Sequence, residues 1–174
     1  MKPVPDATLA QLAQEHGTPL WVYDAATIRA RVAQLAQFDT VRFAQKANSN
    51  IHLLTLMREA GVHVDAVSLG EIERALQAGF TPAQTNGAAG VVFTCDLFDR
   101  TTPARVAAKI EVNCGSVDML RQLGPVSPGH RVWLRINPGY GHGHSNKTNT
   151  GGENSKHGIW HEELPEALAV IRAH

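Results

Sequence analysis

The sequence has little of several features that would place the protein in a specialised class. Of its 174 residues only two are cysteines, and 16 basic residues balance 16 acidic ones. A disulfide scaffold would have more cysteine, so Cys95 and Cys114 are interpreted as reduced, buried thiols of a cytoplasmic protein. A net charge of zero provides no field that would attract nucleic acid or an anionic membrane. No segment approaches the roughly 18 consecutive apolar residues of a membrane-spanning helix, and the first residues lack the apolar run of a signal peptide.

What the sequence does contain, from residue 40 onward, is a regular alternation of strand-like and helix-like segments. The expected strands are residues 40–47, 62–68, 91–95, 110–114 and 131–137. The segments between them have apolar residues at helical spacing. Apolar strands that alternate with amphipathic helices favour an α/β fold with a parallel sheet. Composition alone does not distinguish an incomplete (β/α)8 barrel, which needs ~250 residues when whole, from an open doubly wound sheet.

The chain is divided into two parts, an amino-terminal segment of residues 1–37 and the sheet-forming residues 38–174. Within the first part, residues 19–23 look like a strand, and Asp24 is suited to cap a helix that follows it. Within the second part, Ser68 and Glu71 have the spacing of a capping box, which predicts that a helix begins there.

Lys46 is the most informative single residue, because it stands where the first strand of the alternation ends. In an α/β barrel the carboxyl end of each strand is where chemistry is done. A lysine held there loses hydration, which makes its neutral amine available for imine chemistry. The alternative is a lysine at a strand edge whose ammonium group stays in water. A parallel sheet would bring Asp65, Cys95, Cys114 and Arg135 to the same rim.

Two of these residues have further chemical implications. Asp65 is expected either to hold Lys46 in an ion pair while the site is empty or to interact with amides at the start of the next helix. Arg135 is an ionised group in an otherwise apolar strand, so it requires a partner such as a carboxylate, a phosphate or a cofactor.

Residues 138–158 form an unusual segment of about twenty residues, rich in glycine and hydrogen-bond donors, between a strand and the last helix. Loops of that length are usually functional lids or disordered. His142 and His144, even with His157 and His161, lack an acidic residue at ligand spacing, so no metal site is predicted. The glycine spacing matches neither the dinucleotide fingerprint nor the P-loop. The two remaining interpretations are a mobile loop for an anionic ligand and a disordered segment.

Residues 41–48, 65–71 and above all 137–160 resemble the diaminopimelate decarboxylase group of the fold-type III pyridoxal phosphate enzymes. The resemblance extends over essentially the whole chain from Thr18. It implies that the amino-terminal segment associates with a β domain. Residues 38–174 would then be the first part, about five βα units, of a TIM-like (β/α)8 barrel of the alanine racemase and ornithine decarboxylase type.

The resemblance also implies roles for individual residues. Lys46 matches the lysine that carries pyridoxal 5'-phosphate, Asp65 matches the acid near that lysine, and Arg135 matches an arginine near the cofactor on the fifth strand. One departure is His157, at a position where many relatives have phenylalanine.

The implied activity is the decarboxylation of meso-2,6-diaminoheptanedioate to L-lysine and carbon dioxide, a step of lysine biosynthesis, on a small amino-acid substrate. The implied full-length parent is a cytoplasmic homodimer. The family's phosphate-binding glycine turns and its later barrel units have no counterpart here, so we expect an amino-terminal portion that is inactive by itself. The alternatives are a non-catalytic module that binds pyridoxal phosphate or a subunit, and an amino-acid racemase, against which the Gly-His loop argues.

Overall fold

The computed structural model describes residues 4–85, 87–107, 110–144 and 149–174. Its main feature is a five-stranded parallel sheet whose strands follow the order of the chain. The strands are β1 (Arg42–Ala44), β2 (His63–Ala66), β5 (Val91–Cys95), β6 (Glu111–Cys114) and β7 (Val132–Leu134). All five lie within the expected ranges, so the predicted alternation is confirmed.

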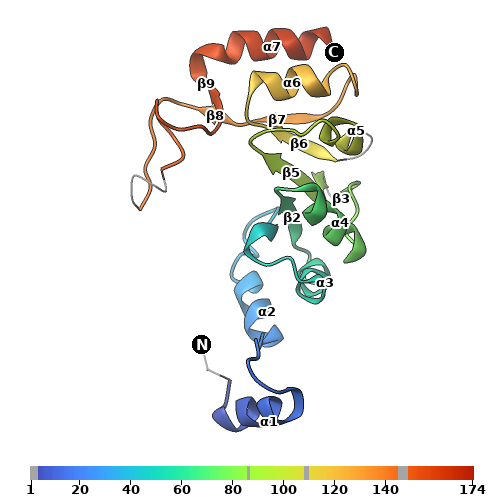
Figure 1. Ribbon diagram of the computed structural model, residues 1–174, viewed down its shortest axis with the longest axis vertical. Coiled ribbons are helices and arrows are strands. Elements are labelled where there is room, and N and C mark those ends of the chain that lie inside the picture. The colour runs from blue at the N-terminus through green and yellow to red at the C-terminus, as the bar shows by residue number, and fades with distance from the viewer. Residues whose placement is uncertain (1–3, 86, 108–109, 145–148) are drawn as a thin grey trace.

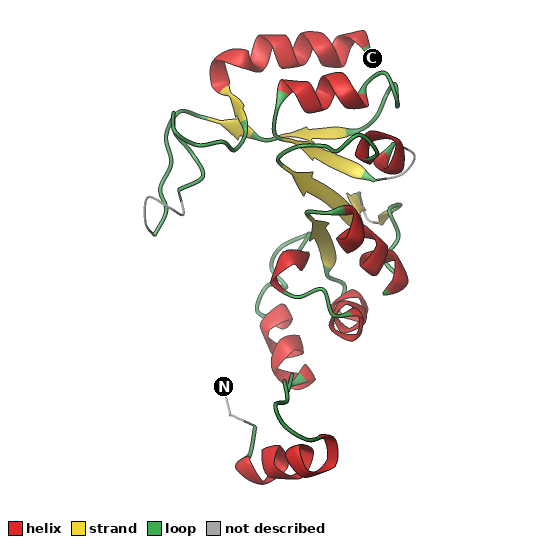
Figure 2. Ribbon diagram, in the orientation of Figure 1, coloured by secondary structure: helices red, strands yellow, loops and turns green. Residues whose placement is uncertain are grey.

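The helices that connect the strands lie along one side of the curved sheet (Figure 2). They are α3 (Ile51–Glu59), α4 (Leu69–Gln77), α5 (Thr102–Val106), α6 (Val117–Leu123) and α7 (Leu164–Ala173). Outward side chains of the strands, such as Val64, Phe93 and Val112, share one hydrophobic core with helix residues such as Leu54 and Met119. A doubly wound sheet has helices on both faces. The one-sided cover is that of an incomplete α/β barrel.

The pairing register decides which side chains share the inner face. Ala44 lies opposite Asp65, Asp65 opposite Val92, and Thr94 opposite Asn113. Because side chains alternate between the faces of a sheet, Asp65 and Thr94 both point away from the helices. The arrowheads of β5 and β7 point toward the side from which residues 138–144 and 149–158 project (Figure 1).

The predicted strand at residues 131–137 is divided in two, so that prediction was wrong in its extent. After β7 ends, β8 (Ile136–Asn137) pairs with β9 (Ile159–Trp160) in a separate parallel pair. Arg135 lies at the junction, with its N–H bonded to the carbonyl of Cys114 and its carbonyl bonded to the N–H of Ile159. The backbone therefore changes sheets at Arg135. A small antiparallel pair, β3 (Gln84–Thr85) and β4 (Ala88–Ala89), was not expected.

The amino-terminal part contains two helices, α1 (Asp6–His16) and α2 (Ala25–Ala33), below the sheet in Figure 1. Asp24 caps α2 as predicted, by accepting hydrogen bonds from the N–H groups of Ala26 and Thr27. The strand expected at residues 19–23 is absent, and no strand of the described residues pairs with this segment. Its largest apolar side chain is not buried against the described residues, since Trp21 is 87% exposed. Strand propensity without a partner strand is not enough to form a sheet.

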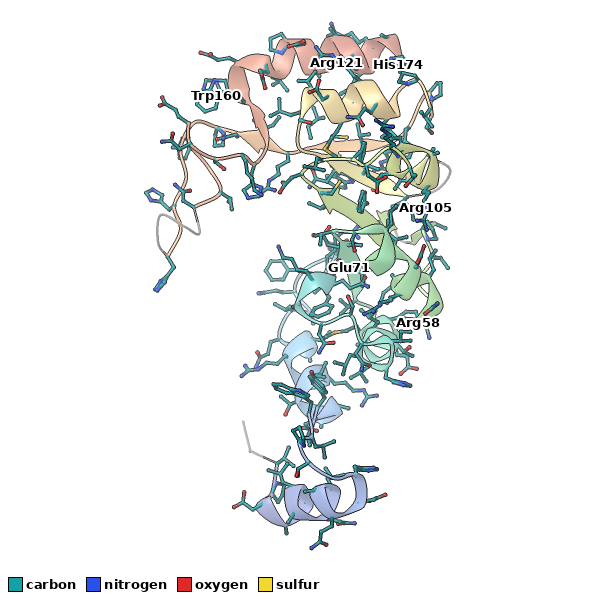
Figure 3. The ribbon with its side chains drawn as sticks, in the orientation of Figure 1. Arg58, Glu71, Arg105, Arg121, Trp160 and His174 are labelled. Carbon is teal, nitrogen blue, oxygen red and sulfur yellow. The ribbon has the colours of Figure 1, made fainter. Side chains whose placement is uncertain are left out.

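Polar contacts are formed at the helix ends. The hydroxyl of Ser68 accepts a hydrogen bond from the N–H of Glu71, as predicted, but the Glu71 carboxylate accepts from Val67 rather than from Ser68. Arg121 of α6, which is labelled in Figure 3, pairs with Glu166 of α7. No helix among the described residues is both long and apolar enough to cross a bilayer.

We predict that the isolated chain self-associates. In the described part of the sheet, β1 and β7 are each hydrogen-bonded on one side only. Trp133 of β7 is also half exposed on the inner face. Unpaired strand edges and uncovered apolar surface are templates for association. Size-exclusion chromatography is expected to give oligomers or aggregates, and a monodisperse monomer would contradict this expectation.

We also predict that both cysteines are protected in the folded chain. Cys95 and Cys114 are free thiols. Burial raises the pKa of Cys95 to about 11 and that of Cys114 to about 12, from an ordinary value of 9.0. The thiolate is the reactive form, so near pH 8 we expect Cys95 to react with iodoacetamide about 100-fold more slowly in the folded chain than in denaturant. Equal rates in the two states would show that these thiols are not buried.

Candidate active site

An open cavity of about 550 Å³ lies at the carboxyl ends of the parallel strands. The charged side chains of its lining are Lys46, Asp65, Asp96, Arg135 and Lys156. The structure therefore brings together the three residues that the sequence singled out, Lys46, Asp65 and Arg135. Cys95 also lines the cavity, whereas Cys114, which was expected at the same rim, is fully buried in the core on the helix side of the sheet.

Lys46 is positioned by a short 3-10 helix, η1 (Gln45–Ala47), that directly follows β1. The neighbouring Gln45 is completely buried, and its amide nitrogen donates to the carbonyl of Glu71 at 2.7 Å. The side chain of Lys46 is exposed and has no hydrogen-bond or ion-pair partner among the described residues. The loss of hydration expected for Lys46 is thus not provided by these residues, and the described structure agrees with the alternative, in which the side chain stays in water.

Asp65 does not bind the partner that was expected. Its Oδ1 accepts a hydrogen bond of 2.6 Å from the hydroxyl of Thr94 on the neighbouring strand. Neither an ion pair with Lys46 nor a bond to helix amides is formed in the described part of the chain, so both interpretations of Asp65 were wrong. Sequence reasoning missed Thr94, although a single hydroxyl in the apolar strand at residues 91–95 was a signal for it.

Arg135 has the carboxylate partner that its burial was expected to require. Its guanidinium lies 3.3 Å from Oδ1 of Asp96, and the same oxygen lies 2.8 Å from Nδ1 of His157. Asp96 directly follows β5, so its place at the carboxyl end of a strand could have identified it. Nothing in the sequence indicated that His157 would lie beside it.

The base of the long loop is held by one buried side chain, Asn137. Its Oδ1 accepts from the N–H groups of Gly139 and Gly152, and its amide nitrogen donates to the carbonyl of Gly152. Residues of the returning half, Thr150 and Lys156, line the cavity. The part of the predicted mobile loop at residues 145–148 lies outside the described residues, and mobility stays a prediction.

The histidines of the loop are not gathered into a metal site in the described structure. His142 and His144 are both exposed. Among the residues described, no three His, Cys, Asp or Glu side chains are grouped so that they could hold a metal ion.

The Asn137 contacts predict that Asn137→Ala opens the loop. A buried polar group that loses its partner costs about 1–3 kcal/mol, which corresponds to tryptic cleavage within residues 138–158 that is about 5- to 150-fold faster. Asn137→Asp is the comparison variant, because it keeps an oxygen for the two glycine N–H groups but replaces the donor to the carbonyl of Gly152 with a second oxygen. Cleavage should be fastest in Asn137→Ala, slower in Asn137→Asp and slowest in the wild-type chain. Equal rates in all three would contradict the role of Asn137 in holding the base of the loop.

Comparison with known proteins gives a consistent result. Residues 25–174 match the family model described as "Pyridoxal-dependent decarboxylase, pyridoxal binding domain". The chain is 66% identical over 167 residues to diaminopimelate decarboxylase of Escherichia coli strain K12, and 62% identical over 167 residues to that of Streptomyces coelicolor. Both alignments cover 95% of this chain, with 39% of the first relative and 38% of the second.

Solved structures lead to the same group. One crystal structure of diaminopimelate decarboxylase, 66% identical, superposes with a TM-score of 0.89 over 97% of this chain and 40% of its own. The Helicobacter pylori enzyme in complex with L-lysine, 26% identical, has a TM-score of 0.80 over 92% of this chain and 42% of its own. The chain thus spans about two fifths of the length of these relatives.

Proposed function

The chain belongs to the pyridoxal-dependent decarboxylase family, and on that premise we propose that it forms the lysine-bearing part of a diaminopimelate decarboxylase site. The reaction is the conversion of meso-2,6-diaminoheptanedioate to L-lysine and carbon dioxide. The relatives that are 66% and 62% identical have this name. The observation that carries the proposal is the unpaired side chain of Lys46 in one cavity with Asp65 and Arg135.

The cavity has the properties that pyridoxal 5'-phosphate requires. Its volume of about 550 Å³ falls within the range of about 300–1,000 Å³ typical of small-molecule sites. An aldehyde needs an unpaired primary amine, and Lys46 has no partner among the described residues. A phosphate needs positive charge, and Arg135 and Lys156 line the same cavity.

The roles proposed for the residues follow from their contacts. Lys46 would hold the cofactor through its amine, and Arg135 would bind an anionic oxygen of it. Asp65, whose Oδ1 is occupied by Thr94, would present its second oxygen to the cavity as a hydrogen-bond acceptor. When bound, the cofactor supplies the electron sink that accepts the electron pair left by departing carbon dioxide. The carboxylate that leaves must be oriented, and the cationic side chains at the rim provide the charge for that.

A second candidate is a module that binds pyridoxal phosphate or a subunit without catalysis. The observation that favours it is the exposure of Lys46, because the described residues do not remove its side chain from water. The homodimeric parent, the cytoplasmic location and the association of residues 1–37 with a β domain remain predictions under either candidate.

The cofactor role of Lys46 predicts a visible absorbance band when the chain is titrated with pyridoxal 5'-phosphate. Lys46→Ala should abolish the band, because the amine that forms the imine is gone. Lys156→Ala is the matched control, since Lys156 is a second exposed lysine of the same cavity. A band that survives Lys46→Ala but disappears in Lys156→Ala would overturn the assignment.

Release of carbon dioxide tests whether the chain itself catalyses the decarboxylation. With carboxyl-labelled meso-2,6-diaminoheptanedioate and the cofactor, an active chain releases labelled carbon dioxide and one equivalent of L-lysine, which would exclude a module that only binds. Release of neither is the result expected for an amino-terminal portion that is inactive by itself, and also for a binding module. The same assay on the Lys46→Ala variant gives the background rate.

A further inference from the structure

We propose that Asp96 and His157 are positioning residues that hold the guanidinium of Arg135 in the cavity. The inference deepens the proposed function and rests on it, because Arg135 is the residue assigned there to the cofactor. Asp96 comes from the end of β5 and His157 from the end of the long loop, 61 residues apart in the sequence. Neither belongs to the residues that the sequence assigned to the site.

Three polar atoms meet at the rim of the cavity. Oδ1 of Asp96 lies 2.8 Å from Nδ1 of His157 and 3.3 Å from a terminal nitrogen of Arg135. That arginine nitrogen lies 3.3 Å from Nδ1 of His157. The side chains are between 24% and 32% exposed. The three side chains are therefore partly buried against one another, and a part of each remains accessible to a ligand.

The chemistry of the donors decides how these atoms bond. A guanidinium only donates, and a carboxylate oxygen only accepts. The short contact to Asp96 requires a proton on Nδ1 of His157, and a protonated Nδ1 has no lone pair for Arg135. Both donors thus converge on a single oxygen of Asp96. Through its Nδ1–H the histidine holds the carboxylate oxygen that the guanidinium also contacts.

The backbone brings His157 to this place. The carbonyl of Arg135 accepts a hydrogen bond of 2.7 Å from the N–H of Ile159. Gly158 lies between, with φ of +85°, and a Cβ there would be 3.1 Å from that carbonyl oxygen. The N–H of His157 is in turn bonded to the hydroxyl of Ser155. The returning strand is therefore held against Arg135, and a glycine is required for this close approach.

The benefit of such an arrangement is pre-organisation. An arginine side chain has several rotatable bonds, and a free one loses rotamer entropy when a ligand binds it. Asp96 restrains the guanidinium before the ligand arrives, and His157 restrains Asp96. The structural alternative is that the Asp96–His157 contact only anchors the loop, with no effect that depends on Arg135.

Two variants of His157 separate these roles. His157→Phe keeps a ring but removes the donor, and His157→Asn places an amide nitrogen near the position of Nδ1. The measured quantities are the dissociation constant for pyridoxal 5'-phosphate, from the visible band, and tryptic cleavage within residues 138–158. We expect His157→Phe and Asp96→Asn to weaken cofactor binding about tenfold, as for one lost hydrogen bond, and His157→Asn to restore it to within about threefold of wild type.

A double-mutant cycle with Arg135→Ala tests the dependence on Arg135. If Asp96 and His157 act through Arg135, His157→Phe has no further effect on the dissociation constant in the Arg135→Ala background. The positioning role would be overturned if His157→Phe weakened cofactor binding equally in the wild-type and Arg135→Ala backgrounds. It would also be overturned if His157→Phe and His157→Asn weakened cofactor binding equally and both made the loop more rapidly cleaved. Those results would leave the proposed function intact, whereas a wild-type chain without any band would overturn both.

Discussion

The site depends on one constraint, the in-register parallel pairing of the five strands of the main sheet. Ala44, Asp65 and Val92 lie opposite one another along neighbouring strands. A slip of one residue would turn every side chain of a strand to the other face, so Asp65 and Thr94 would enter the helix layer and Val64 would face the cavity. The apolar face buried by the helices resists such a slip. Burial of the apolar face under the helices stabilises the core. It therefore also determines which polar side chains line the cavity on the opposite face.

The two carboxylates of the cavity have partners other than Lys46. Asp65 accepts a bond from Thr94, and Asp96 accepts from His157 and Arg135. The division of partners leaves Lys46 without a hydrogen-bond or ion-pair partner among the described residues and restrains Arg135 beside Asp96.

The sequence predicted those features that depend on local patterns. The five strands and the cap at Asp24 could be predicted, because buried apolar runs and capping residues act over a few positions. The break at Arg135 could not, since it depends on pairing with β9, which follows a long loop. Residues 19–23 have strand-like composition but no partner strand in the described chain. Lys46 and Arg135 were recognised as strand-end residues, whereas the contacts of Asp65, and the Asp96–His157 pair, depend on tertiary proximity that spacing does not encode.

The central claim is that this register presents Lys46, and not another amine, to the cofactor. The most direct measurement is to mix the chain with pyridoxal 5'-phosphate, reduce with borohydride, and locate the modified lysine by mass spectrometry of a digest. The account predicts that the label is on Lys46, with little on Lys156 although both lysines line the cavity. A label spread equally over the two, or found mainly on Lys156, would contradict it.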